Sequence, residues 1–428
     1  MKLNYLRRLE RVIVVVLLVG AAGTGLPAPF SSLWGDAITL GTYGFVPLVS
    51  LLRWKKIFYV ATRDIPILLL TAMAVLSFFW SASPDSTLQY AKALLRNTLF
   101  GIYLATCYSP KEQMRQLLWV FGIIMILSLL LGLGMPSFAI SDEGLWKGVL
   151  GHKNLLARMM ALSALLFACA AIDDPKQRRI RLAGFILAIV LLLLTQGKTA
   201  LVLLLFGLSL LPLYNVIKQY YKLRVFLLLM AIILGGTLAV WISVNLETII
   251  VDYLGKDMSM SGRDELWAVL IQRGLQRPWL GYGYAGFWNN LREVLIVNSL
   301  TWFEHKTGGH AHSGFIDLFL QFGFVGLLLF AWSCLTILIR VIQLLFSTQA
   351  IEYLWLLEFI LITTLSNYSL TSTVLDESNI VWLLYVSTAF STALWSERIR
   401  RNYYRKELHI HNNPALKRGT VDNLPNYQ

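Results

Sequence analysis

The feature that most constrains this chain is a series of long apolar stretches separated by short charged segments. A helix needs about 20 mostly apolar residues to cross the roughly 30 Å hydrocarbon layer of a membrane. By that measure we predict an all-α polytopic membrane protein of about 12 transmembrane helices. The predicted spans are 12–30, 35–52, 64–82, 92–108, 115–134, 154–172, 181–196, 199–216, 223–244, 313–341, 351–371 and 378–396.

The composition agrees, because only 14% of the 428 residues are charged and 57% are hydrophobic. A soluble domain usually has about 25% charged residues. The net charge of +13 could indicate nucleic-acid binding, but the basic residues cluster in short loops between apolar runs. That distribution is typical of a membrane protein, so we expect no nucleic-acid partner. Cys107, Cys169 and Cys334 lie in apolar segments and predict neither disulfides nor a metal site.

The positions of lysine and arginine predict the orientation of the chain. Most of the 37 basic residues share one side if the N-terminus is cytoplasmic, whereas the loops near 23–34 and 372–377 carry none. This bias favours the cytoplasm, and an even number of spans returns the C-terminus there. We predict one membrane domain over 1–396 in a bacterial inner membrane, with a periplasmic loop near 245–312 that contains short helices. The basic tail, 397–428, should be cytoplasmic and partly disordered, with its early arginines against membrane lipids.

A second set of basic residues falls on the periplasmic side, against this bias. A charge inside a span costs roughly 2.5–3.5 kcal/mol even on the lenient insertion scale, and Arg96 and Arg158 are the residues most subject to that cost. A single long side chain can reach the interface without any other role. A whole set on one face favours an anion pocket, because guanidinium groups bind phosphate oxygens through paired hydrogen bonds. The set is Lys92, Arg96, Lys147, Lys153, Arg158, Lys198, Lys256, Arg263, Arg273, Arg277, Arg292 and Lys306.

The long loop has order of its own. A short helix should begin at Ser261 and end before Pro278, with the apolar face of Leu266 and Leu270 on the membrane surface. The run 281–288 alternates glycine with aromatic residues. Its rings could stack on sugars, or they could form an aromatic belt at the headgroups.

Three histidines end this loop. His305, His310 and His312 precede a span, and a neutral imidazole is well suited to accept a proton near pH 7. A closed metal site is disfavoured, because the flexible pair Gly308-Gly309 lies among these histidines and no carboxylate cluster is near them in the sequence. Interfacial histidines with wet nitrogens are the plainer alternative. Asp317 follows two helical turns after His310 and could orient it.

Several short segments between residues 145 and 335 lie in order before, within and after the long loop. They are Gly151-His152-Lys153-Asn154-Leu155-Leu156-Ala157, Thr195-Gln196-Gly197-Lys198-Thr199-Ala200, Ser261-Gly262-Arg263-Asp264-Glu265-Leu266-Trp267, Pro278-Trp279-Leu280-Gly281-Tyr282-Gly283, and His310-Ala311-His312-Ser313 with Gly323 and Gly326 after it. Together they resemble the bacterial O-antigen ligase and polymerase superfamily, and the Gly-His-Lys-Asn version looks most like its exopolysaccharide-polymerase branch.

The resemblance implies a multi-span (C-type) membrane glycosyltransferase. Such an enzyme moves a glycan from polyprenyl pyrophosphate to an acceptor hydroxyl at the periplasmic face. The acceptor is another lipid-linked repeat unit in polymerases and a lipid A core sugar in ligases. The resemblance implies no nucleotide sugar, no metal and no other cofactor, and it allows other polysaccharide assembly proteins as partners.

The functional positions of the family fall here on Lys198, Arg263 and His312. The family more often has arginine where Lys198 stands and frequently has asparagine where Ser313 stands. Pyrophosphate leaves as an anion, so the reaction needs positive charge at the leaving group and a base for the acceptor hydroxyl. We expect Lys198 and Arg263 to bind pyrophosphate, His312 to be the base with His310 as the alternative, and direct attack to invert the anomeric centre. Further candidates for the pyrophosphate are Lys153, Arg158 and Arg96.

A transporter or flippase for a lipid-linked or anionic substrate is the alternative function, because intramembrane arginines and broken helices occur there too. A transporter should carry its charges near the midplane in two related halves. This chain places them on one face and has no repeat between its halves. A non-catalytic scaffold for polysaccharide export would leave the histidine and arginine set unexplained. The choice between polymerase and ligase stays open.

Overall fold

The computed structural model describes residues 2–219, 224–254, 262–301, 309–368, 375–376 and 380–411. Within these ranges the secondary structure is helical, apart from an isolated bridge between Ile140 and Trp146. The elements before the middle of the chain are α1 (Lys2–Ala21), α2 (Phe30–Leu40), the π-helical η1 (Gly41–Phe45), α3 (Val46–Leu52), α4 (Trp54–Ala61), α5 (Ile65–Leu76), η2 (Ser77–Phe79), α6 (Pro84–Cys107), α7 (Pro110–Gly134), α8 (Pro136–Ala139) and η3 (Gly148–Leu150). The later elements are α9 (Lys153–Asp173), η4 (Pro175–Gln177), α10 (Arg178–Thr195), α11 (Lys198–Gln219), α12 (Arg224–Leu254), α13 (Gly262–Gly274), α14 (Leu291–Leu300), α15 (Gly314–Thr348), α16 (Ile351–Ser366) and α17 (Ile380–His411).

Local capping chemistry sets where several of these helices begin. Ser109 and Glu112 form a reciprocal capping box at the start of α7, and Pro110 occupies its first turn. Proline is tolerated there because the missing N–H has no helical partner at that position. Asp64 caps α5 by accepting a hydrogen bond from the backbone N–H of Ile67. These starts follow directly from the local sequence.

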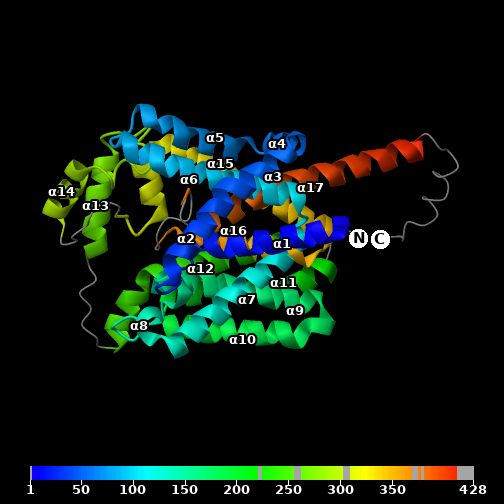
Figure 1. Ribbon diagram of the computed structural model, residues 1–428, viewed down its shortest axis with the longest axis horizontal. Helices are drawn as coiled ribbons and strands as arrows, with labels where there is room; N and C mark the ends of the chain where they lie inside the picture. The colour runs from blue at the N-terminus through cyan, green and yellow to red at the C-terminus, as the bar shows by residue number, and fades with distance from the viewer. Residues whose placement is uncertain are drawn as a thin grey trace.

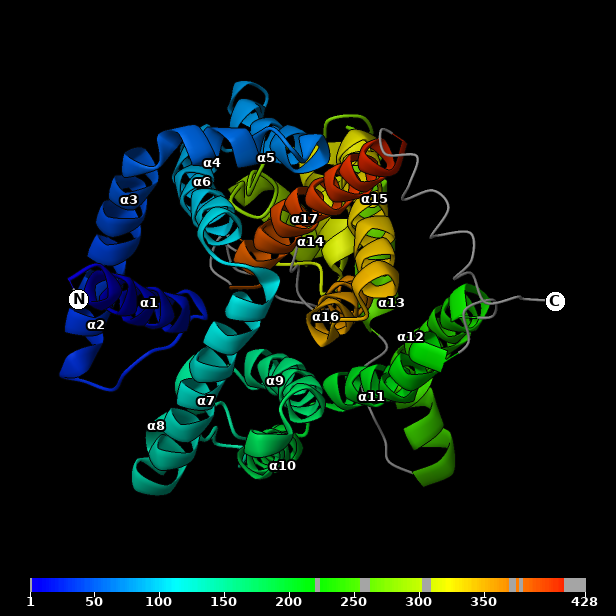
Figure 2. The same ribbon diagram turned by 90° about the vertical axis from the view of Figure 1, so that its right-hand side faces the viewer.

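The long helices run side by side, and the ends of the bundle differ (Figure 1). α1 begins and α17 ends at the same end, which we call the terminal end, whereas α13 and α14 lie at the opposite end. The opposite end also carries His310 and His312, and we call it the histidine end. Figure 2 looks along the bundle from the terminal end, with α1 to α3 on one side and α11 and α12 on the other. α16 and the first part of α17 are almost wholly buried between them.

Within the described ranges, 5 helices or continuous helical segments are long and apolar enough to cross a membrane. They are Phe30–Leu52, Pro110–Gly134, Lys153–Asp173, Lys198–Val216 and Gly314–Thr348. The count becomes 6 if α4 and α5 with η2, bent by 98° at their junction, form one broken span. The chain is therefore an all-helical membrane protein, and the larger count of about 12 remains a prediction. The turn at Gln196 and Gly197 separates two distinct helices, α10 and α11.

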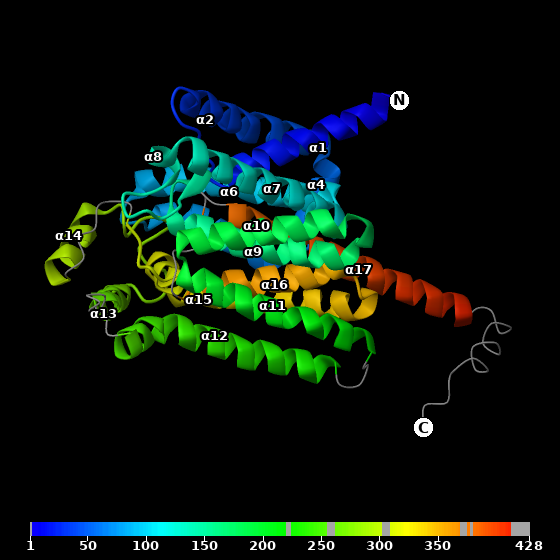
Figure 3. The same cartoon turned by 90° about the horizontal axis from the view of Figure 1, so that it is seen from below.

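Residues 262–301 form a small layer across the histidine end (Figure 3). Its core contains Leu266 and Leu270 of α13 packed with Tyr282, Phe287 and Trp288. The prediction that the apolar face of α13 rests on the membrane surface was therefore wrong, because that face packs against the protein. The prediction that sugars could stack on these three rings is also wrong, since all three are buried.

Candidate functional site

The histidine segment, residues 309–313, connects the long loop to the start of α15. The rings of His310 and His312 lie against each other, with centroids 4.3 Å apart and an interplanar angle of 53°. Both side chains are half-buried. The structure thus brings the two candidate bases together at one position.

The backbone between the two histidines is held from two sides. The indole Nε1 of Trp267 on α13 donates to the carbonyl of Ala311 at 2.9 Å. The N–H of Ala311 donates to Oδ1 of Asp317 at 3.0 Å, and that oxygen also accepts from Nε1 of Trp288 at 2.8 Å. Asp317, expected to orient His310, therefore acts on the backbone beside it. Ala311 is fully buried and is hydrogen-bonded through both its N–H and its carbonyl, so it limits the movement of the histidine rings on either side of it.

His312 has a left-handed backbone conformation, with φ of 53°. A residue with a Cβ adopts this region at a cost of order 1–3 kcal/mol, and such residues concentrate at functional sites. The conformation is fixed just downstream, where the N–H of Gly314 donates to the carbonyl of Asn367 at 2.7 Å. The fold thus holds the ring of His312 in a position that the local backbone disfavours.

The Pro278–Gly283 motif has a structural role, because it fills a break in α15. The helix is interrupted at Gly323, whose φ is 62° and ψ is −156°. The N–H groups of Tyr282 and Gly283 donate to the carbonyls of Leu320 and Gln321 at 2.7 and 2.9 Å. The N–H of Phe324 donates to the carbonyl of Pro278 at 2.7 Å, so the loop replaces helical hydrogen bonds that the break removes.

Gly323 and Gly281 are required for this docking. A Cβ on Gly323 would lie 2.3 Å from the carbonyl oxygen of Pro278, and one on Gly281 would lie 2.5 Å from the carbonyl carbon of Gln321. Both glycines also have positive φ, which side chains with a Cβ rarely adopt. The glycines therefore allow two backbones to touch, and they indicate no nucleotide loop.

An ion pair joins α13 to α14. Nε of Arg273 donates to Oε2 of Glu293 at 2.9 Å, and both side chains are largely buried. Tyr282 donates its hydroxyl to the carbonyl of Arg273 at 3.0 Å. Burial raises the pKa of Tyr282, and the charge of Glu293 adds to that effect, so the phenol keeps the proton it donates. Arg273 is thus committed to the structure of the loop.

Lys198 is the first residue of α11, after a tight turn. Gln196 has a left-handed backbone, and the hydroxyl of Thr195 accepts from the N–H of Gly197 at 3.1 Å. A Cβ on Gly197 would lie 2.4 Å from the Cβ of Ala157, so the turn packs directly against α9. The side chain of Lys198 is exposed, and its helix start lies beside the residue that precedes Arg158.

Arg158 is buried inside the protein, with 5% of its surface exposed. Its Nε and Nη1 atoms have no hydrogen-bond partner among the described groups. The carboxylate that interacts with it electrostatically is Asp376. The neighbouring Leu375 accepts a hydrogen bond from the hydroxyl of Tyr284, which links this position to the long loop. Buried guanidinium groups are normally paired, so Arg158 is the cation best suited to meet an anion that enters the protein.

Two further cations have partners of their own. The guanidinium of Arg96 lies 4.7 Å from the ring centroid of Tyr43, and Lys153 forms an ion pair with Glu143 at 3.3 Å. Their place in an anion site stays a prediction. Arg263 lies in the first turn of α13, four residues before Trp267, but its side chain is outside the described residues. His305 and Ser261 are outside them altogether.

The sequence reasoning missed Trp267, Trp288, Asn367 and Asp376. The indoles were assigned to stacking surfaces or left unassigned, although a buried indole needs an acceptor. Asp376 carried a signal that could have been used, because it is acidic in a loop without basic residues near the periplasmic ends of spans.

Two comparisons with known proteins found similar sequences. The O-antigen ligase family model matches residues 183–331, which include Lys198, Arg263 and both candidate histidines. The exopolysaccharide production protein ExoQ of Rhizobium meliloti (strain 1021) is 24% identical over 322 residues, covering 72% of this chain and 72% of that protein.

The helical bundle, with several helices long and apolar enough to cross a membrane, defines the chain as a polytopic membrane protein. In sequence, the chain resembles the O-antigen ligase and polymerase superfamily. This similarity supports a polymerase or ligase function.

Proposed function

We propose that this protein is a membrane glycosyltransferase that moves a glycan from polyprenyl pyrophosphate onto an acceptor sugar hydroxyl at the periplasmic face. The observation that carries the proposal is the fixed pair of histidines at the end of the bundle where α9, α11 and α13 begin. Those helix starts bring Lys153, Arg158, Lys198 and Arg263 to the same end. The ExoQ relative favours an exopolysaccharide polymerase, with an O-antigen ligase as the second candidate.

In the proposed reaction, the acceptor hydroxyl oxygen attacks the anomeric carbon of the donor sugar. The bond from that carbon to the pyrophosphate oxygen breaks, and polyprenyl pyrophosphate leaves as an anion. The proton of the acceptor hydroxyl passes to the imidazole of His312, with His310 as the alternative base. This single displacement inverts the anomeric centre and needs no metal or other cofactor.

The positive charges act on the leaving group. Lys198 and Arg263 bind the pyrophosphate, and Arg158 adds a guanidinium that is already desolvated. Charge that is in place before the reaction stabilises the transition state without reorganisation of solvent. Lys198 contributes a point charge where arginine would form a two-pronged contact.

The topology belongs to the same proposal. The histidine end faces the periplasm, and both termini face the cytoplasm of a bacterium with this protein in its inner membrane. Residues 1–396 form one membrane domain of about 12 spans, in the manner of C-type glycosyltransferases. Residues 397–428 form a basic cytoplasmic tail.

A deletion strain tests the proposal and separates its two forms. Loss of a polymerase leaves single repeat units on their acceptor, whereas loss of a ligase leaves long glycan on the carrier lipid. Complementation with the intact gene should restore the wild-type profile in either case. An unchanged polysaccharide profile in the deletion strain would contradict the transferase and favour a transporter of another substrate.

A further inference from the structure

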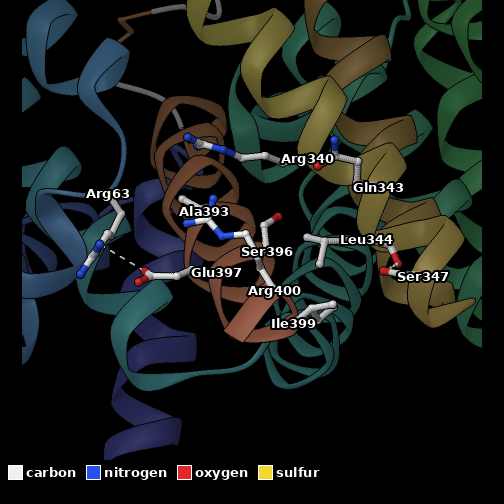
Figure 4. A pocket seen from close by; sticks show the side chains of 10 residues that line it. All are labelled: Arg63, Arg340, Gln343, Leu344, Ser347, Ala393, Ser396, Glu397, Ile399 and Arg400. Atoms are coloured by element: carbon white, nitrogen blue, oxygen red, sulfur yellow. Dashed lines mark hydrogen bonds and ion pairs between the residues drawn. The ribbon is translucent and has the colours of Figure 1, made fainter. Parts of the chain in front are cut away.

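A cavity at the terminal end is distinct from the site described above. It has a volume of about 610 Å³ and lies between the α4–α5 junction, the last turns of α15 and the middle of α17. Figure 4 shows Arg63 on one side of it, Arg340 on another, and residues of α17 between them. Its place at the end opposite His310 and His312 separates it from the proposed transfer reaction.

Two of the arginines that line the cavity have carboxylate partners. Arg63 forms an ion pair with Glu397 at 3.3 Å, and Arg340 pairs with Asp64. Glu397 is also shared with Arg401. Each carboxylate is therefore engaged before any ligand binds, and the carboxylates hold the two guanidinium groups at the cavity wall.

Positive charge and donors remain in excess. Arg400 lines the cavity and has no ion-pair partner among the residues that the structure describes. Nε of Arg63 is buried without a hydrogen-bond partner there, and so is the hydroxyl oxygen of Ser396. Unpartnered buried polar atoms cost free energy unless a ligand or water satisfies them. The cavity thus offers guanidinium and hydroxyl donors that the protein itself leaves unused.

We propose that this cavity binds a phosphate-bearing anion. Guanidinium groups form charge-assisted hydrogen bonds to phosphate oxygens, and such contacts are about twice as strong as those between neutral groups. The remaining wall includes Leu344, Ala393 and Ile399, which would contact an apolar group attached to the phosphate. The phosphate can come from an anionic phospholipid of the adjacent leaflet or from a soluble phosphate compound.

The test uses the full chain purified in detergent and measures binding by native mass spectrometry and by the shift in thermal unfolding. One arm adds phosphatidylglycerol, with phosphatidylcholine as its matched neutral lipid, and the other adds inorganic phosphate. Binding in the phosphatidylglycerol arm identifies a lipid source, and binding in the phosphate arm identifies a soluble one. No saturable binding in either arm would overturn the proposal.

Variants locate the binding. Arg400→Gln removes an exposed, unpaired charge and should weaken binding about tenfold, the size of one charge-assisted contact. Arg398→Gln is the control, because Arg398 is on the same helix but its guanidinium lies 5.0 Å from the ring centroid of Trp395 and does not line the cavity. Ala393→Leu reduces the cavity volume without changing charge and should also weaken binding. Equal binding by wild type and Arg400→Gln, or equal loss in Arg398→Gln, would sink the idea.

Discussion

Arg340 near the terminal end of the bundle and Arg158 at the histidine end differ in the partners of their guanidinium groups. At the terminal end, Arg340 is paired with Asp64 and Arg53 forms an ion pair with Glu10 at 2.6 Å. At the histidine end, Arg158 is buried with two nitrogen atoms that lack hydrogen-bond partners. His312, at the same end, has a disfavoured backbone conformation. The ion pairs of Arg340 and Arg53 hold helices together, whereas the disfavoured backbone of His312 and the unsatisfied nitrogens of Arg158 are features that a protein retains for function.

The largest expected effect is on the rate of transfer. His312→Ala should lower it about 10³-fold, within the 10²–10⁴ that a general base supplies. The measurement is transfer of a polyprenyl-pyrophosphate-linked glycan by the purified variant. Ser313→Ala, at the next residue, should stay within a few-fold of wild type. A His312→Ala enzyme with near-wild-type rate would remove this histidine from the mechanism.

The second effect concerns the stability of the terminal end. Arg340→Met leaves the fully buried Asp64 without its cation, and we expect a loss of about 3 kcal/mol in the free energy of unfolding. Denaturant unfolding in detergent measures it. Arg401→Met breaks an ion pair whose arginine is 60% exposed, and it should cost less than about 1 kcal/mol. Equal losses in the two variants would show that burial of the pair does not matter.

The third prediction concerns the histidine end. Arg158→Met removes a buried guanidinium that has unsatisfied nitrogens, and its electrostatic partner Asp376 is only half-buried. The loss in the free energy of unfolding should therefore be smaller than in Arg340→Met. The transfer rate should fall about tenfold, the size of one lost charge-assisted contact to the pyrophosphate. A variant that unfolds like Arg340→Met, with an unchanged rate per folded molecule, would mean that Arg158 is structural and would break the comparison.

The smallest effect tests how the histidines are held. Trp267→Phe keeps an aromatic ring but leaves the buried carbonyl of Ala311 without its donor, at a cost of about 1 kcal/mol in stability. The rate should fall by less than in His312→Ala, because the base is present but less well fixed. Trp279→Phe is the matched control, since that indole is 66% exposed. A similar fall in both variants would show that the Trp267 hydrogen bond does not position the histidines.

Much of the candidate site could be predicted because its parts are local in the sequence. His310 and His312 are two residues apart just before a span, and Lys198 opens a helix after a glycine turn. Helix starts and periodic apolar runs depend on a few neighbouring residues, so they are visible without a structure. The burial of Arg158 was not visible, because it depends on which helices pack around α9.

The sequence by itself determined a helical membrane protein that resembles the O-antigen ligase and polymerase superfamily, because apolar run length and short ordered motifs are properties of the chain alone. Tertiary structure decided whether each apolar helix face contacts lipid or protein. The stripe of Leu266 and Leu270 has the same period whether it touches lipid or protein, and only packing places it against Phe287 and Trp288. Packing likewise joined Asp317 to the indole of Trp288 and left Arg158 without hydrogen bonds at two of its nitrogens, because both environments are built from segments that are far apart in the chain.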